Sequence, residues 1–273
     1  YITMKPVFIP DYIKKYLNAD SLGATYLKNV NISYSKNLAK GYPEISIVIP
    51  AYNEEKNIVP TLASLCDNKT DNSVEIIVVN NNSTDKTEQL VNACGVNCIL
   101  EKKQGITPAR NAGLSQARGH IILNADADTI YPKDWIEEMT RPLINNKNIA
   151  MTYGRFSFIP TAKTGRLFYF FYEIIADLSR FYNNYRKGKA VNVYGFNSGF
   201  RREQGLQVDC FNHPEGTNED GFLALKLSQK GFGKIFRVKS TKAIVWTTDR
   251  RIQMDGGVFK GTLKRLKRVL NIE

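Results

Sequence analysis

The feature that most constrains the fold of this chain is a series of short apolar, largely β-branched runs. They occupy residues 45–50, 75–79, 96–100 and 120–123. Uninterrupted runs of this length are typical of strands that are buried on both faces. Helices are expected between them, over about 54–65, after the capping residues 83–87 as far as 94–95, and over 108–118 with Gly119 closing the last. Strands that alternate with helices predict an α/β fold, with a parallel sheet and helices on both faces.

Polar side chains follow three of these predicted strands at the point where each strand ends. They lie in the segments 50–55, 80–83 and 124–128. In open parallel sheets, ligands bind beyond the carboxyl ends of the strands. We therefore expect the three segments to meet at one edge of the sheet and to hold the functional site.

Asp126 and Asp128 form the first candidate pair of carboxylates. In an extended segment alternate side chains point the same way, so both can face one site while Ala127 turns into the wall. Such a pair suits Mg²⁺ or Mn²⁺, which takes one or two carboxylates and completes its shell with water and phosphate oxygens. A solvated acidic turn before a helix beginning at about 132–135 explains the same residues, and the spacing does not separate the two interpretations.

Glu219 and Asp220 form a second acidic pair, at the start of a predicted helix that ends at Gly231. Carboxylates in a first helical turn interact favourably with the helix dipole, and Thr217 is a candidate cap. The pair is therefore explained by helix stability alone. The dipole also keeps an aspartate ionised at neutral pH, so Asp220 is equally a candidate general base.

Composition limits the class of protein. Hydrophobic residues are 42% of the 273 residues, as in ordinary globular proteins, and 38 Lys and Arg against 26 acids give a net charge of +12. This charge favours phosphates, anionic lipid or nucleic acid as partners. No uncharged apolar run approaches the about 18 residues of a membrane span, and no early stretch resembles a signal peptide. We expect a cytoplasmic protein, either free or peripheral on the inner face of the membrane.

Five segments, at 45–55, 75–87, 108–113, 126–128 and 218–227, together resemble family 2 glycosyltransferases, and the similarity extends over about residues 45–251. The resemblance implies a GT-A fold and the transfer of a sugar, with inversion, from a nucleotide-sugar. It implies a Rossmann-like donor half over about 44–130 that is contiguous with an acceptor half over about 131–257. Residues 1–43 are then an N-terminal extension.

The resemblance also implies roles for individual residues. Those implied for the nucleotide are Pro50, Ala51, Tyr52, Glu54, Asn80, Arg110 and Asp126. Asn80 stands where the family usually has an aspartate that accepts a hydrogen bond from uracil, so the chain departs from the pattern there. UDP remains the expected nucleotide.

For the reaction, the resemblance implies Asp220 as catalytic base with Glu219 beside it, and Asp128 with Asp126 as ligands of Mn²⁺ or Mg²⁺. Many relatives have a metal-binding histidine after the last strands, and the segment 243–251 has none. Asp249 or water is the expected substitute. The residues assigned to the diphosphate or the acceptor are Arg250, Arg251, Asn197 and Arg201.

The expected partners are a nucleotide-sugar donor, a glycan or lipid-linked acceptor and an anionic membrane surface, but not nucleic acid. One alternative is a nucleotidyltransferase acting on sugar phosphates, although no glycine-rich phosphate loop with a following lysine appears after Pro50. The other is a non-catalytic basic module that binds anionic surfaces or nucleic acid, although the basic residues are spread along the chain.

Two further segments bear on membrane contact. The aromatic stretch 167–178 carries a charge in every turn, and we expect a helix that packs mostly into the core, with interfacial contact or sugar stacking as alternatives. Residues 258–273 form a basic amphipathic pattern, with apolar residues at 259, 263, 266 and 270. Such a helix either lies on an anionic membrane or docks on the core with its lysines in solvent.

Overall fold

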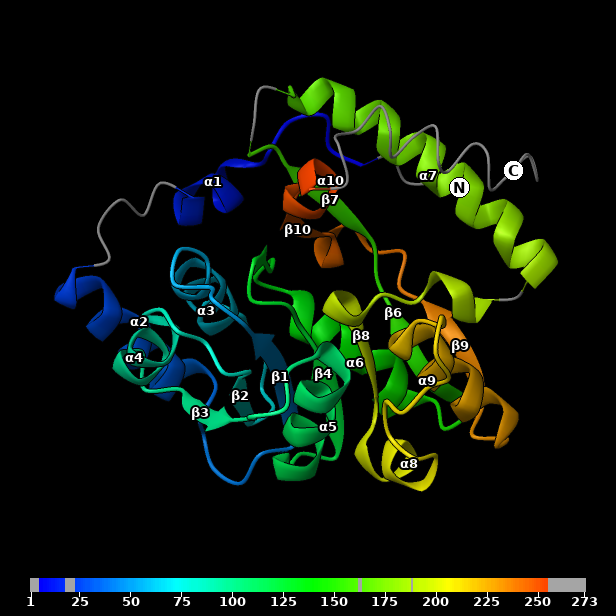
Figure 1. Ribbon diagram of the computed structural model, residues 1–273, viewed down its shortest axis with the longest axis horizontal. Coiled ribbons are helices and arrows are strands. Elements are labelled where there is room, and N and C mark those ends of the chain that lie inside the picture. The colour runs from blue at the N-terminus through cyan, green and yellow to red at the C-terminus, as the bar shows by residue number, and fades with distance from the viewer. Residues whose placement is uncertain (1–4, 18–22, 162–163, 188, 255–273) are drawn as a thin grey trace.

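The computed structural model of the protein describes residues 5–17, 23–161, 164–187 and 189–254, without the side chains of 181–187, 189 and 191. The basic pattern predicted to be a helix at 258–273 lies outside the described residues. Figure 1 shows an α/β architecture built around one large sheet.

The large sheet has the order β3-β2-β1-β4-β8-β6-β9. Its strands are β1 (Ile45–Ala51), β2 (Val74–Asn80), β3 (Asn97–Leu100), β4 (Ile121–Asn124), β6 (Ile149–Tyr153), β8 (Ser198–Arg201) and β9 (Lys234–Arg237). All neighbours run parallel except β8, which is antiparallel to both β4 and β6. The predicted mostly parallel sheet is confirmed.

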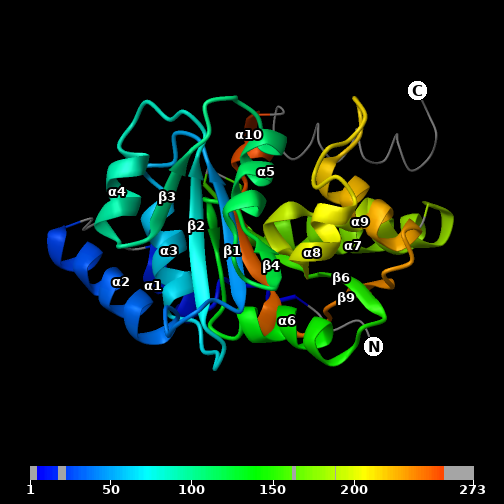
Figure 2. The same ribbon diagram turned by 90° about the horizontal axis from the view of Figure 1, so that it is seen from below.

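Side chains of the central strands alternate between two separate apolar cores. Ile47 and Ile49 of β1 face the core that contains α3 (Ile58–Cys66), whereas Val48 faces the core that contains α5 (Ile106–Gln116) and α9 (Glu219–Gln229). This two-sided burial explains why the strands read as continuous apolar runs rather than as alternating patterns. Figure 2 shows α2, α3 and α4 (Thr87–Ala93) on one side of β1–β3 and α5 on the other.

The N-terminal region packs on the first core. It contains α1 (Asp11–Leu17) and α2 (Ala24–Asn37). Ile13 and Val30 are buried in the same apolar cluster as the strand residues of β1. The remaining helices are α6 (Trp135–Asn145), α7 (Arg166–Lys187), α8 (Arg202–Gln207) and α10 (Arg250–Met254), with short 3₁₀ turns at η1 (Lys189–Asn192), η2 (Gly195–Asn197) and η3 (Thr241–Ala243).

A second, small sheet has the order β5-β10-β7, from β5 (Thr129–Ile130), β7 (Phe156–Ile159) and β10 (Val245–Thr248). The sequence analysis did not anticipate it, because its strands are short and their partners are far apart in the chain. β10 runs antiparallel to β5 and parallel to β7. Because Thr247 pairs with Thr129, the residues that follow Thr248 lie close to the loop that holds Asp128.

Two helix boundaries differ from expectation. α3 begins at Ile58 rather than near Glu54, because residues 54–57 form a turn in which the Glu54 carbonyl accepts from the N–H groups of Asn57 and Ile58. α5 ends at Gln116, so Gly119 does not close it. A Cβ at Gly119 would lie 2.6 Å from the backbone of Ile45, which shows that the glycine is needed for close packing against β1.

The packing of α7 is also unlike the prediction. Its buried face carries Tyr169, Tyr172 and Ala176 together with the charged Glu173, whereas many of its large apolar side chains are exposed. The helix is therefore not packed mostly into the core through its apolar residues. Burial of Glu173 is tolerated because its carboxylate forms ion pairs with Arg166 of the same helix and with Lys5 of the N-terminal segment. None of the helices in the described ranges is both long and apolar enough to span a membrane.

Candidate active site

A pocket of about 310 Å³ opens at the carboxyl ends of β1 and β4, as the parallel sheet predicts. Eight of the residues proposed from the sequence line it: Pro50, Ala51, Tyr52, Glu54, Asp126, Asp128, Arg250 and Arg251. They come from three regions separated by up to about 200 residues of chain. Tyr52 is 50% exposed, so its ring is available to stack on a flat ligand.

The loop after β1 is held by the loop after β2. Asn53 adopts a left-handed conformation (φ 54°), and its side-chain oxygen accepts from the backbone N–H of Thr84 at 2.8 Å. The N–H of Glu54 donates to Thr87 Oγ1 at 2.8 Å, and the N–H of Asn53 donates to Ser83 Oγ at 3.0 Å. These bonds turn the chain sharply after the strand and direct the Glu54 side chain toward the pocket.

Arg250 connects two carboxylates that are far apart in sequence. Its guanidinium donates twice to Glu54, with Nη1 3.1 Å from Oε2 and Nη2 in a short contact with Oε1. Nη2 also lies 3.3 Å from Oδ2 of Asp128. A fork of this kind fixes orientation as well as charge. The beginning of α10 thus joins the loops after β1 and β4 into one wall.

Asp128 lies at the centre of this wall. Oδ2 accepts from Thr248 Oγ1 at 2.8 Å, and the side chain is largely buried. Burial raises the pKa of Asp128, the nearby Asp126 raises it further, and Thr248 and Arg250 act in the opposite direction. The rise reflects mainly the cost of removing a charged carboxylate from water, with a smaller contribution from the neighbouring Asp126.

The two carboxylates fit a divalent cation of the Mg²⁺ type. Asp126 and Asp128 both line the same pocket, and a cation there would favour the ionised form of both carboxylates. Among the residues that the structure describes there is no cluster of three or more His, Cys, Asp or Glu side chains suited to a metal. Two carboxylates with the remaining positions on water and ligand oxygens match the habit of Mg²⁺, which is rarely bound by an all-protein cage.

A buried ionic cluster lies behind the pocket, around Arg110. The side chain of Arg110 is 2% exposed, and its nitrogens lie 3.1 Å from Asp126 Oδ1, 3.5 Å from Asp220 Oδ1 and 3.9 Å from Glu219 Oε1. Burial by itself would lower the pKa of Arg110, but the carboxylates of Asp220, Asp126 and Glu219 outweigh it and raise the pKa. One guanidinium therefore joins the pocket to the start of α9.

Asp220 occupies the first turn of α9 and is 3% exposed. Burial raises its pKa to about 7, and the charge of Arg110 opposes that rise. Asn218 caps the helix by accepting from the N–H of Gly221, whereas the Thr217 hydroxyl donates to the carbonyl of Pro214. The suggestion that Thr217 caps α9 is therefore wrong, and the first turn is stable without help from Asp220.

Asp220 is not among the residues that line the pocket, and the backbone of Gly195 hydrogen-bonds to its carboxylate. A Cβ at Gly195 would collide with both Asp220 and Arg110 Nη2. Asp128 and Asp220 are thus connected through Asp126 and Arg110. Asp128 lines the pocket, whereas Asp220 lies in the buried cluster beside it.

Three other proposed residues have structural partners. Asn80 accepts from the N–H of Ser83 at 3.0 Å and donates to Glu88 at 2.9 Å. Asn197 accepts from the Trp135 indole N–H at 2.8 Å and donates to the carbonyl of Arg155.

Arg201 is the last residue of β8, at the end of the strand away from Asn197, and it donates to the carbonyls of Leu143, Ile149 and Asn146. Neither Arg201 nor the two asparagines is among the residues that line the pocket.

Several pocket residues were missed from the sequence: Asn81, Gln104, Gly105 and Ile106. Asn81 organises them, because its amide donates to the carbonyls of Glu101 and Lys103 and accepts from the N–H of Gly105 at 2.8 Å. The signal was a run of three asparagines after the second strand, of which only the first was chosen. Gly105 takes φ 132°, which favours glycine.

Comparison with known proteins places this arrangement in context. Residues 46–204, more than half of the chain, match the family described as Glycosyl transferase family 2. The "Probable glycosyltransferase YdaM" of Bacillus subtilis is 31% identical over 144 residues, which are 49% of this chain and 34% of that protein. The chain thus spans about a third of the length of this curated relative.

Solved structures show the same fold at low sequence identity. Staphylococcus aureus TarS (residues 1–349), in complex with UDP, has a TM-score of 0.56 and 20% identity over 75% of this chain and 60% of that one. Glucosyl-3-phosphoglycerate synthase from Mycobacterium tuberculosis, with Mn²⁺, UDP and phosphoglyceric acid, has a TM-score of 0.55 and 19% identity over 90% of this chain and 83% of that one.

Proposed function

Because this chain belongs to glycosyl transferase family 2, we propose that it transfers a sugar from a nucleotide-sugar, with UDP as the nucleotide, to a hydroxyl group of a glycan or lipid-linked acceptor. The observation that carries the proposal is the connection of the Asp126–Asp128 pocket, through Arg110, to the buried Asp220. Two chemically different carboxylate environments 90 or so residues apart in sequence are thereby joined in one site.

The pocket is the donor site in this proposal. Tyr52 stacks on the base, and the walls formed by Pro50, Ala51 and Glu54 enclose the ribose. Arg250 and Arg251 face the diphosphate, which is the part of the donor that carries negative charge. The UDP-bound neighbour TarS and the UDP-bound and Mn²⁺-bound synthase support the choice of a nucleotide diphosphate, although their identity to this chain is only 20% and 19%.

Asp128, with Asp126, would hold a divalent cation, Mn²⁺ or Mg²⁺. When bound, such a cation neutralises the negative charge of the departing diphosphate. The residues of this chain then have separate tasks. Glu54 and Thr248 fix the positions of Arg250 and Asp128, so the groups that face the diphosphate do not have to be ordered when the donor binds.

Asp220 is the general base in this proposal. It takes the proton from the acceptor hydroxyl as the oxygen attacks the anomeric carbon, while the bond from that carbon to the diphosphate breaks on the opposite face. A single displacement of this kind inverts the configuration. A pKa of about 7 suits a general base at neutral pH. The carboxylate is almost fully buried and accepts a hydrogen bond from the Gly195 backbone, so the acceptor has to gain access to it before the proton can be transferred.

Donor binding provides the direct test. UDP with Mn²⁺ or Mg²⁺ should raise the melting temperature, whereas UDP alone, the metal alone or duplex DNA should change it little. GDP is the comparison for the base. Incubation with a panel of UDP-sugars should then release UDP slowly by hydrolysis. A melting temperature that responds equally with and without the metal, or more to DNA than to UDP, would contradict the proposal.

A further inference from the structure

Helix α7 has an unusual arrangement, because charged side chains such as Glu173 lie on its inner face while many of its large apolar side chains are exposed. Leu167, Phe171, Ile174, Ile175 and Leu178 are between 41% and 59% exposed. Their spacing of three and four residues places them on one face of the helix. We call these five residues the α7 crest. An exposed apolar stripe of this size on a single helix is unusual for a surface that meets only water.

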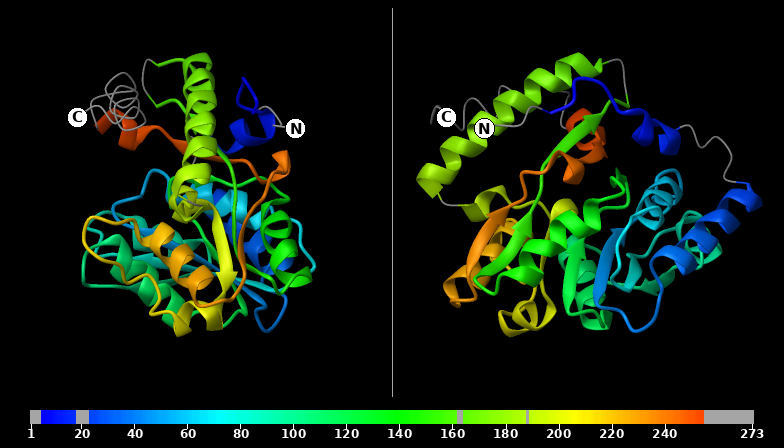
Figure 3. Two further views of the ribbon diagram at one scale, coloured as in Figure 1. Left: turned by 90° about the vertical axis from the view of Figure 1, so that its right-hand side faces the viewer. Right: turned by 180° about the vertical axis from the view of Figure 1, so that it is seen from behind.

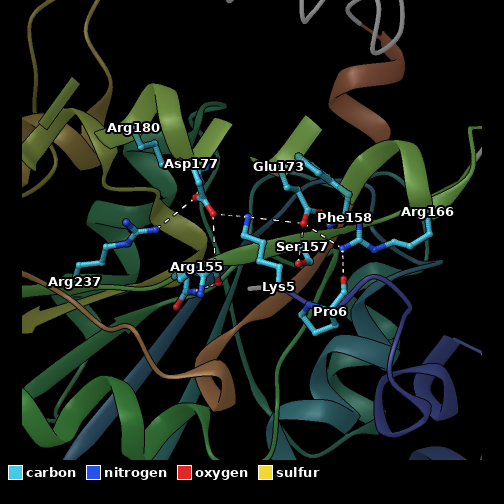
Figure 4. A network of polar contacts seen from close by, with 11 residues as sticks. Lys5, Pro6, Arg155, Ser157, Phe158, Arg166, Glu173, Asp177, Arg180 and Arg237 are labelled. Atoms are coloured by element: carbon cyan, nitrogen blue, oxygen red, sulfur yellow. Dashed lines mark hydrogen bonds and ion pairs between the residues drawn. The ribbon is translucent and has the colours of Figure 1, made fainter. Parts of the chain in front are cut away.

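The charged residues of α7 whose side chains the structure describes, Arg166, Glu173, Asp177 and Arg180, lie on its inner side and are paired. Arg166 lies 3.1 Å from Glu173, and Lys5 lies 3.8 Å from Glu173 and 3.7 Å from Asp177. Figure 4 shows this network between α7, the strand β7 and the N-terminal segment.

Asp177 has further partners in this network. Arg237 lies 3.4 Å and Arg155 3.5 Å from its carboxylate, and Arg180 pairs with it along the helix. Because these ion pairs fix the rotation of α7 about its axis, the helix is held with its apolar face outward. The outward crest is thus specified by the fold and is not a consequence of loose packing.

Helix α7, which carries the crest, lies at the outside of the molecule (Figure 3). In both views of Figure 3, α7 runs along one side of the protein, above the large sheet, with the N-terminal segment and α10 beside it. Two more exposed apolar residues belong to segments that contact α7. Phe8 lies two positions after Pro6, whose carbonyl accepts from Arg166, and Met254 follows Gln253, whose amide donates to the Tyr169 hydroxyl.

We propose that the α7 crest inserts into the surface of an anionic lipid bilayer. An exposed apolar helix face inserts into lipid without a complementary surface, whereas a protein partner would have to supply one. The protein carries a net charge of +12, and the sequence that continues from Met254 holds five basic residues between positions 260 and 268. Charge of one sign attracts anionic lipid and opposes the association of two copies of the chain.

This attachment bears on the proposed transfer reaction and rests on it in one respect. The Tyr169 hydroxyl, on the inner face of α7, donates to Asp249, which directly precedes the pocket residue Arg250. The donor pocket therefore lies close to the part of α7 around Tyr169. A membrane at the crest would bring a lipid-linked acceptor to the same end of the molecule, which selects that acceptor class over a freely soluble glycan.

Vesicle binding by the full chain tests the inference. The double variant Ile174→Gln/Leu178→Gln should bind phosphatidylcholine vesicles that contain about one third phosphatidylglycerol at least about tenfold more weakly. The reason is that it lacks two aliphatic side chains that the lipid would bury. The matched control is Ile32→Gln/Ile144→Gln, on α2 and α6, whose side chains are 53% and 51% exposed. It should bind as the unaltered protein does.

A fluorescent probe gives a second measurement. Phe171→Trp adds an exposed indole, whereas Trp135 and Trp246 are fully buried and contribute a constant background. On anionic vesicles its emission should shift to the blue and be quenched by lipids brominated on their acyl chains. The same emission without a shift on bound vesicles would overturn the inference, because it would place the crest in water.

Other outcomes also decide the matter. Equal vesicle binding by the crest variant and the control, or no binding by the unaltered chain, would overturn the inference. A concentration-dependent dimer in sedimentation that only the crest variant dissociates would show that a second copy covers the crest. The metal-dependent melting shift with UDP, measured without lipid, should be the same in all these variants, so a failure of the proposed donor site is detected separately.

Discussion

The Asp220→Asn variant should retain the fold and the donor site while losing transfer activity. Asparagine has the same shape, Asn218 caps α9 without it, and Asp220 is not among the residues that line the pocket. The metal-dependent affinity for UDP should therefore stay within a few-fold of the original. Loss of a general base lowers the rate by about 10²–10⁴-fold.

The dependence of the rate on pH should identify the same group. With the pKa of Asp220 at about 7, the ionised fraction in the free enzyme is about one tenth at pH 6 and about one hundredth at pH 5. The value of kcat/KM should consequently fall about tenfold for each unit below neutrality. The residual rate of Asp220→Asn should not show this step, because the titrating group is gone.

Stability should change with pH in the direction opposite to that produced by an aspartate whose pKa is lowered by a salt bridge. The folded-state pKa of Asp220, about 7, is above the value of 3.8 expected for the unfolded chain. Between these values the unfolded chain is ionised while the folded protein keeps the proton, so rising pH favours unfolding. The melting temperature of Asp220→Asn minus that of the original protein should increase from about pH 4 to pH 7 and then level off.

Glu219→Gln is the matched control, because it removes the same charge from the cluster around Arg110. Turnover is followed by UDP release from the donor found in the sugar panel, and melting by scanning fluorimetry across the pH range. The assignment of Asp220 fails if Asp220→Asn keeps more than about a tenth of the original rate. It also fails if Glu219→Gln loses as much activity as Asp220→Asn, since the effect would then be one of cluster charge.

The remaining predictions concern the pocket wall and the contact between Gly195 and Asp220. Asp128→Asn should abolish the rise in melting temperature that UDP gives together with Mn²⁺, while the small response to UDP alone stays as in the original protein. Arg250→Lys loses the two-pronged contact with Glu54 and should weaken UDP binding by about tenfold in calorimetry. Because the side chain is 43% exposed, the free energy of unfolding should change little. Unchanged binding would contradict a role of Arg250 in holding the diphosphate. Gly195→Ala should lower the melting temperature by several degrees, since the methyl group meets Asp220 and Arg110, and an unchanged melting temperature would contradict the close packing at this position.

The predictable part of the site was the part determined by neighbouring residues in the chain. Apolar runs located β1, β2 and β4, and the polar residues that follow them line the pocket. Arg250 and Asp128 were chosen as site residues from the family resemblance, and both line the pocket, but the fork to Glu54 was not predicted. It depends on the pairing of β10 with β5, which joins segments more than 100 residues apart and leaves no local pattern.

The choice among three consecutive asparagines shows the same limit. Asn80, Asn81 and Asn82 are alike in sequence, and strand periodicity does not say which will face a ligand. In the structure Asn80 ends β2 and bonds to its own loop, Asn81 organises the opposite wall of the pocket, and Asn82 turns the chain with φ 63°. A one-residue difference in where the strand ends changes the neighbour that each amide meets.

Apolar periodicity and short motifs are properties of nearby residues, so the class of fold, the family and the sheet edge of the candidate site could be predicted from the amino-acid sequence. The burial of Asp220 against Arg110 and the inward direction of Glu173 and Asp177 on α7 could not. The pKa of a side chain and the exposed face of a helix depend on the distant groups that surround them. Those neighbours exist only after the chain has folded.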